Sequence, residues 1–266
     1  MKKLISLLLI AVLLLTASIP AIATDTSEAA LTAEDIINQS METMRQLDSF
    51  KAEGNYIVNK DGTNVEIQRL FERNKTNHSL HGQTIKDGEK IRETYIQGDY
   101  IYRLSRKTGE FVKAKINRYR ERFFQRAFNP RDHLEDISHT AAFVLDSEQT
   151  DDTHYVIHVE GELQENITTV LEGKGFELPD ELEIEAHYTF YVQKETHYLD
   201  RVEVTINGST EEEKTATVSG AITLEGFNQT EITVPEDVLN ADTINHKQIK
   251  AKIIQVKIKI KHWFNF

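Results

Sequence analysis

The chain of 266 residues contains no cysteine, and this absence excludes several classes of protein. Without thiols there can be no disulfide scaffold, no thiolate zinc or iron–sulfur site, no cysteine nucleophile and no lipid-modified cysteine of a bacterial lipoprotein. The chain also has only 4 prolines and 12 glycines, with 39% hydrophobic and 28% charged residues. That composition is typical of a folded globular protein and not of a disordered or collagen-like one.

Positive charge is scarce over most of the sequence. The formal net charge is −12 at pH 7. Two lysines lie in the first 23 residues and six in the last twenty, and neither stretch contains an acid. The body between them is therefore more acidic than the total. Because nucleic-acid binding depends on lysine and arginine contacts to phosphates, nucleic acid is excluded as a general partner.

The sequence also lacks any catalytic motif. It has no Gly-x-Ser-x-Gly elbow, no Walker phosphate loop and no His-Glu-x-x-His helix. In a strand, His154 and His158 would lie ~13 Å apart at about 3.3 Å per residue, which is too far to share one metal ion at about 2 Å per ligand bond. We therefore expect a protein that is not an enzyme, with no metal site and no cofactor.

The N-terminus has the pattern of a secretory signal peptide. Lys2 and Lys3 precede an apolar run from Leu4 to Leu15, and the segment ends in the small-x-small triplet at 21–23. The uncharged stretch is long enough for a membrane anchor, but Pro20 and the final triplet favour cleavage. An exported chain without cysteine fits the bacterial cell envelope, or secretion from it, better than a eukaryotic secretory route.

Cleavage after Ala23 would leave Thr24 as the first residue of the mature protein. N-terminal sequencing of the exported protein should therefore begin at Thr24, and a sequence that begins at Met1 would contradict the export prediction.

Hydrophobic periodicity predicts an α+β fold. Thr32 with Asp35 is a helix N-cap pattern, and apolar residues recur at helical spacing to Leu47. From Phe50 the period changes to two, with turn residues at 61–62, 87–88, 98–99 and 108–109, as in an antiparallel meander. A second helix is expected over 117–128, because Pro130 ends it, and a short one over 163–171. Further one-sided strands follow, including 182–192, 202–206 and 215–224.

One-sided strands and the lack of helices between them favour an antiparallel sheet with helices on one face. The expected organisation is a signal peptide (1–23), a polar leader (24–31), one domain (32–240) and a basic amphipathic C-terminal extension (241–266). Two smaller domains within the body are the alternative.

The order of these elements resembles the exported LolA/LppX-like superfamily, and especially its uncharacterised bacterial envelope proteins. The resemblance rests on the helix that runs into Asp48–Gly54 and on a late Val234–Val238 motif, Val-Pro-Glu-Asp-Val. It implies a curved antiparallel sheet forming a half-open barrel, with amphipathic helices on the concave face and a cavity that takes up acyl chains. The chain differs from many members in lacking a cysteine after the signal peptide, so it is not expected to be a lipoprotein.

Two helical segments supply candidate ligand-binding residues. One is the N-terminal helix, whose adaptable methionines suit an apolar pocket, although the same residues could simply fill the core. The other is the segment around 117–128, where arginines suited to an anionic head group alternate with aromatic residues, although these arginines could instead pair with the acidic body. The candidates are Ile37, Met41, Met44, Tyr119, Phe123, Phe124, Phe128, Arg118, Arg122 and Arg126.

The C-terminal tail combines lysines with apolar and aromatic residues. Such a segment suits an anionic membrane surface, whereas an edge strand protected by lysines is the alternative. The expected membrane contacts are Lys257, Lys259, Lys261, Trp263, Phe264 and Phe266.

The sequence therefore supports two hypotheses for the function. The first is an exported, non-enzymatic protein that binds an apolar or lipidic ligand, or a lipoprotein acyl chain, at the cell envelope. The second is an envelope interaction or sensor protein with a filled core, whose basic segments bind a protein partner or an anionic polymer.

Overall fold

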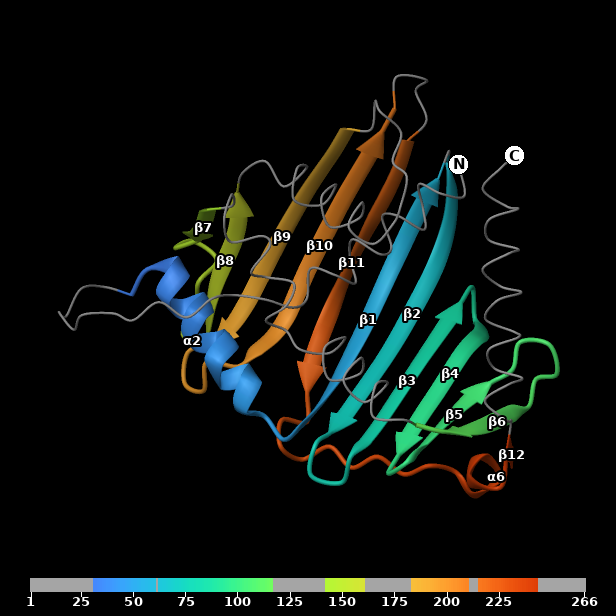
Figure 1. Cartoon of the computed structure of the whole chain (residues 1–266). Helices are drawn as coiled ribbons and strands as arrows, with labels where there is room; N and C mark the ends of the chain where they lie inside the picture. The colour runs from blue at the N-terminus through green and yellow to red at the C-terminus, as the bar shows by residue number, and fades with distance from the viewer. Residues whose placement is uncertain (1–30, 61, 117–141, 161–182, 211–214, 244–266) are drawn as a thin grey trace.

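A computed structural model describes residues 31–60, 62–116, 142–160, 183–210 and 215–243. The expected signal peptide, polar leader, helices over 117–128 and 163–171, and most of the C-terminal extension lie outside these residues. Within them the expected fold class is confirmed: the chain forms one large open antiparallel sheet with a helix on one face (Figure 1).

The N-terminal helix α2 (Ala33–Gln46) begins where the capping pattern predicts. The Thr32 side chain accepts a hydrogen bond from the backbone N–H of Asp35, and the Asp35 carboxylate accepts one in return from the Thr32 N–H. This reciprocal capping satisfies donors that a helix start would leave unpaired. The buried side of α2 includes Ile36, Ile37 and Met41, so the helix packs its apolar stripe against the sheet.

The sheet has 12 strands in the described part of the chain. Their order is β12-β6-β5-β4-β3-β2-β1-β11-β10-β9-β8-β7. Every pair is antiparallel except β12 with β6. The strands are β1 (Ser49–Lys60), β2 (Thr63–Asn74), β3 (Ser79–Lys86), β4 (Glu89–Gln97), β5 (Tyr100–Leu104), β6 (Phe111–Lys115), β7 (Ala142–Leu145), β8 (His154–Glu160), β9 (Glu183–Gln193), β10 (Leu199–Ser209), β11 (Thr215–Glu225) and β12 (Asp242–Thr243).

Pairing of β1 with β11 joins the two halves of the sheet. Ten consecutive residue pairs connect these strands, from Lys51 with Glu225 to Lys60 with Ala216. The first meander, β1 to β6, therefore continues directly into the later strands β7 to β11. Because β7 and β12 end the order without pairing to each other, the sheet is open and not a closed barrel.

The predicted turns are confirmed where the structure describes them. Gly62, Gly88, Gly98 and Gly109 all have positive φ, and each lies between two antiparallel neighbours of the meander. Positive φ is accessible to glycine without the steric cost that a Cβ brings. These turns fix the register of the meander and thus decide which side chains share a face.

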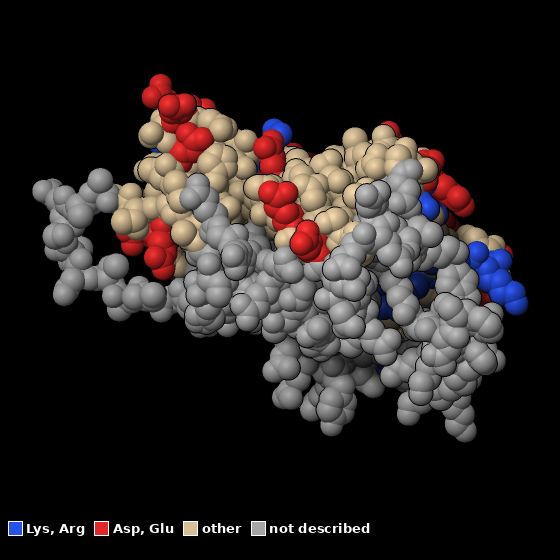
Figure 2. All heavy atoms as spheres, turned by 90° about the horizontal axis from the view of Figure 1, so that it is seen from above, with Lys and Arg blue, Asp and Glu red and all other residues tan. Residues whose placement is uncertain are grey.

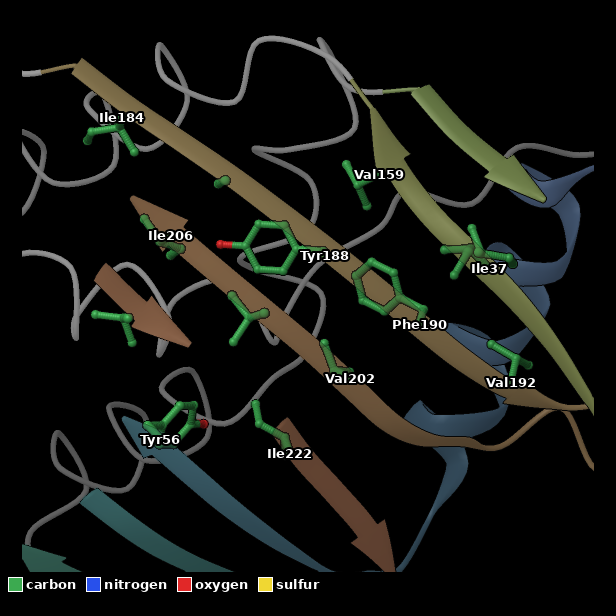
Figure 3. Packing of buried hydrophobic residues seen from close by; sticks show 14 of the residues in the cluster. Ile37, Tyr56, Val159, Ile184, Tyr188, Phe190, Val192, Val202, Ile206 and Ile222 are labelled. Atoms are coloured by element: carbon green, nitrogen blue, oxygen red, sulfur yellow. The ribbon is translucent and has the colours of Figure 1, made fainter. Parts of the chain in front are cut away.

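One face of the sheet, here called the inner face, is the face that α2 covers. On β7–β11 and β1 its side chains are apolar, and with the helix they form the largest buried cluster (Figure 3). The cluster includes Tyr56, Val58, Ile157, Val159, Ile184, Ala186, Tyr188, Phe190, Val192, Val202, Val204, Ile206, Val218 and Ile222. The strict alternation in β9 and β10 is therefore explained by burial of one face only.

The outer face is partly covered by the C-terminal segment of the described body. The late Val-Pro-Glu-Asp-Val motif leads into the short helix α6 (Glu236–Leu239). Val234 and Val238 are buried with Tyr95 and Tyr102, whose side chains leave the outer side of β4 and β5. The motif thus packs on the outer face of the meander and forms a second, smaller apolar cluster there.

Candidate functional site

The inner face has two chemically different halves. Over β8–β11 and β1 it is apolar, as described above. Over β2–β5, four arginines occupy inner positions: Arg69, Arg73, Arg92 and Arg103. They are on the inner face because cross-strand partners share a face, and these arginines are in register with the inner positions of β1.

Three rows of cross-strand partners contain these arginines. The first runs Gly54, Arg69, Thr84, Arg92; the second runs Ala52, Phe71, Gly82, Thr94, Arg103; the third runs Phe50, Arg73, Leu80, Ile96, Ile101. No acid occupies any of these positions. The third row also forms a small apolar floor, in which Leu80, Ile96 and Ile101 pack together. The basic half is therefore a mixture of guanidinium groups and apolar side chains.

Arg69 is half-buried, and its Nε atom is buried without a hydrogen-bond partner. Burial lowers the pKa of Arg69, the nearby Tyr56 opposes this, and the positive charge of Arg92 lowers it further. Among the described residues, no carboxylate forms an ion pair with Arg69 or Arg92. A partly buried cation is costly without a counterion. Because the described ranges supply no carboxylate to Arg69, its position favours an anion.

Tyr56 marks the border between the two halves, and two glycines make room for its ring. A Cβ at Gly54 would lie 2.6 Å from the Tyr56 hydroxyl oxygen, so the hydroxyl lies over Gly54, beside Arg69 in the neighbouring strand. A Cβ at Gly220 would lie 2.8 Å from Tyr56 Cδ1 and would clash with the Asn55 carbonyl oxygen. Burial raises the pKa of the Tyr56 hydroxyl to about 12.

Tyr188 places a second hydroxyl in the apolar half. Its side chain projects from β9 near Ile206 and Phe190 (Figure 3). The residue is 5% exposed, and its hydroxyl oxygen is buried with no hydrogen-bond partner. Burial raises the pKa of Tyr188 well above its ordinary value. A buried hydroxyl without a partner is uncommon in folded proteins.

The outer face holds a buried polar network around Glu93. The Glu93 carboxylate accepts hydrogen bonds from Lys90 Nζ at 2.7 Å, Tyr95 Oη at 3.0 Å and Gln83 Nε2 at 3.1 Å. His81 lies between two carboxylates, 3.1 Å from Glu93 and 2.7 Å from Glu72, and its ring stacks on Tyr95. Every polar group has a partner here, so we interpret the network as structural.

Other histidines form separate pairs. His154 Nε2 lies 2.7 Å from Asp200 and His158 Nε2 lies 2.9 Å from Asp146. Within the described ranges, no group of three or more His, Asp or Glu side chains is placed to hold a metal ion.

The structure describes three of the ten predicted ligand-binding residues. Ile37 and Met41 are 3% and 7% exposed and lie in the cluster between α2 and the inner face. Met44 packs with Leu47 and Phe50 near the end of the helix. The other seven (Tyr119, Phe123, Phe124, Phe128, Arg118, Arg122 and Arg126) lie outside the described residues, as do the predicted membrane contacts (Lys257, Lys259, Lys261, Trp263, Phe264 and Phe266).

Sequence reasoning missed both the inner-face arginines and Tyr188. In β2 the signal is visible, because Arg69 and Arg73 share period two with Ile67 and Phe71. The link to Arg92 and Arg103 depends on the register of β3 with β4, which contains an irregularity between Thr84 and Ile85.

Viewed from above, Lys and Arg side chains gather chiefly at the end that holds β4–β6, whereas Asp and Glu are spread along the visible surface (Figure 2).

Among the helices that the structure describes, none is long and apolar enough to cross a membrane.

Comparisons with known proteins give one family match and several similar solved structures. A family model described as a family of unknown function (DUF6612) matches residues 32–243. No curated protein sequence matches the chain. The chain is similar to the lipoprotein LppX of Mycobacterium tuberculosis, with 13% identity, a TM-score of 0.43, and coverage of 75% of this chain and 96% of LppX.

Two further solved structures match the chain at lower scores. A LolA superfamily protein from Nitrosomonas europaea has 10% identity and a TM-score of 0.25, with 79% of this chain and 97% of that protein covered. A chain of the Pseudomonas aeruginosa MucA/MucB complex has 12% identity and a TM-score of 0.34. In that case 79% of this chain is covered but only 60% of the other. These similarities concern the fold alone.

Proposed function

The chain belongs to the family of unknown function DUF6612, and we propose from the geometry of its inner face that it is an exported, non-enzymatic protein that binds an apolar or lipidic ligand at the bacterial cell envelope. The observation that carries the proposal is the width of the apolar inner face. Its buried side chains extend from β8 to β2, whereas α2 makes its main contacts with β7, β9 and β10.

The unpartnered Tyr188 hydroxyl supports the same proposal. A core that only had to be filled would be stabilised by phenylalanine at this position, because burying a hydroxyl without a hydrogen bond costs about 1–3 kcal/mol. Ligand sites typically combine an apolar lining with a few polar groups that fix orientation. Tyr188 and Tyr56 supply two such groups on one apolar surface.

Filling the inner face should abolish binding. Ala186 is 8% exposed and lies across from Ile206 on the inner face of β9 and β10. In Ala186→Trp the indole would occupy the space of a ligand, so we expect saturable binding of N-phenyl-1-naphthylamine, measured by its fluorescence, to be lost with little change in melting temperature.

Glu185→Trp is the matched control, because Glu185 is exposed and points to the opposite face of the same strand. This variant should bind the dye as the natural protein does. If the natural protein binds no dye and Ala186→Trp lowers the melting temperature by several degrees, the inner face is a filled core. The function would then be that of an envelope interaction protein.

A further inference from the structure

The arginines of the inner face have no role in holding a purely apolar ligand. We propose that Arg69 and Arg92 bind the anionic head group of an amphiphile whose hydrocarbon chain lies on the apolar half of the same face. This inference rests on the proposed function and names its ligand class: a single-chain or multi-chain lipid with a phosphate or carboxylate at its polar end.

Charge segregation across the sheet is the first step of the argument. The three rows through the arginines carry guanidinium groups and no acid on the inner face. Glu66, Glu72 and Glu93 occupy the alternate positions on the outer face. Glu89, at the start of β4, is in register with Lys86 in the inner row next to that of Arg69. An anion placed on these three rows therefore meets guanidinium groups and no carboxylate of the same rows.

The neighbourhood of Arg69 is the second step. Arg69 and Arg92 are both in register with Thr84, so they flank one residue on the inner face. No carboxylate within the described ranges neutralises either guanidinium. The two guanidinium groups flank Thr84 and repel each other. One anion bound between them would relieve this repulsion through charge-assisted, bidentate hydrogen bonds.

The position of this pair relative to the apolar half is the third step. Arg69 on β2 neighbours Tyr56 on β1, and the apolar strands β11, β10 and β9 follow in order. Four inter-strand spacings of about 4.8 Å separate β2 from β9, or roughly 19 Å. A long acyl chain laid across the strands would thus extend from the arginines to the Tyr188 region.

Two lipids that differ only in the phosphate test the proposal. We expect 1-oleoylglycerol 3-phosphate to displace the bound dye at a concentration at least about tenfold lower than 1-oleoylglycerol, because only the phosphate can form charge-assisted hydrogen bonds with the two guanidinium groups. Arg69→Gln and Arg92→Gln should each reduce this preference to about twofold or less. Inorganic phosphate alone should not displace the dye.

Arg201→Gln is the control, because it removes an arginine from the outer face of β10, where Arg201 pairs with Glu203. Its lipid preference should be that of the natural protein. Because Arg92 is exposed, Arg92→Gln should fold even if Arg69→Gln does not. The lipid preference can then be measured in Arg92→Gln alone.

The possible failures are distinguishable. Equal binding of both lipids, unchanged in the arginine variants, would overturn the head-group assignment and leave lipid binding intact. Binding of neither lipid would overturn the proposed function itself. Binding of inorganic phosphate with an affinity equal to that of the phospholipid would contradict an amphiphile as the occupant.

Discussion

Replacement of Gly220 by alanine is expected to destabilise the protein by about 3 kcal/mol, the upper part of the range for overpacked cores. The added Cβ would clash with the Asn55 carbonyl oxygen and crowd the Tyr56 ring. Neither is the flexible end of a side chain, so the β1–β11 pairing would have to shift. Since this pairing joins the two halves of the sheet, we expect the melting temperature to fall by roughly 6–12 °C.

Gly82→Ala provides the matched control on the same face. Gly82 lies at an inner position of β3, and the nearest atom to its Cβ would be the Leu70 carbonyl oxygen at 4.0 Å. This variant should be neutral or more stable by about 0.5–1 kcal/mol, because glycine in a strand carries an entropic cost. Equal melting temperatures of the two variants would contradict the close approach of β1 and β11.

Replacement of Glu93 by glutamine is expected to lower the free energy of unfolding by about 2–3 kcal/mol at pH 7. Glu93 is 5% exposed and accepts charge-assisted or neutral hydrogen bonds from Lys90, Gln83 and Tyr95. A glutamine amide would turn an NH₂ group toward one of these donors and leave it unpaired. Urea denaturation at pH 7 measures the loss.

The same variant should change how stability depends on pH. Burial alone would raise the pKa of Glu93, but hydrogen bonds from Lys90, His81 and Tyr95 outweigh it and lower the pKa below its ordinary value of 4.5. A carboxylate with a lowered pKa contributes stability above the unfolded-state pKa, and this contribution is lost as the pH falls through the folded-state pKa. The difference between the natural protein and Glu93→Gln should therefore shrink from pH 7 to pH 3.

Glu66→Gln is the control for both measurements. Glu66 is an exposed acid on the same outer face, in β2, so its replacement should change stability by no more than about 0.5 kcal/mol. A constant stability difference between Glu93→Gln and the natural protein from pH 7 to pH 3 would show that the Glu93 charge does not stabilise the fold.

Local features of the fold could be predicted because each has a local physical cause. Thr32 and Asp35 cap a helix through groups three residues apart, and glycines such as Gly62 and Gly88 accept the positive φ of tight turns. Alternation in β9 follows from burial of one side. Each of these is encoded within a few neighbouring residues.

Long-range pairing could not be predicted in the same way. Ile57 is opposite Ser219 across β1 and β11, and nothing near either residue specifies so distant a partner. The inner-face arginines depend on the same kind of information, since Arg69 and Arg92 meet only through the register of three strands. With 43 acids in the chain, the sequence also could not single out Glu93, which is buried only because strands β2–β4 bring its partners together.

The predicted arginine and aromatic part of the site stays a prediction. An apolar surface with arginines for an anionic group was expected from the helix around 117–128, which lies outside the described residues. In the described body, arginines also occur on the sheet, in β2–β5. The predicted Ile37 and Met41 do lie on the inner face, but as buried contacts between α2 and the sheet.

Mass spectrometry of the organic extract of the protein, purified without detergent from a bacterial host, tests the central claim most directly. If the inner face binds a lipid, the extract should contain an amphiphile with an anionic head group in near-stoichiometric amount, and the extract of Ala186→Trp should contain far less of it. An extract free of lipid from a folded natural protein, with no uptake when the protein is incubated with 1-oleoylglycerol 3-phosphate, would contradict the claim.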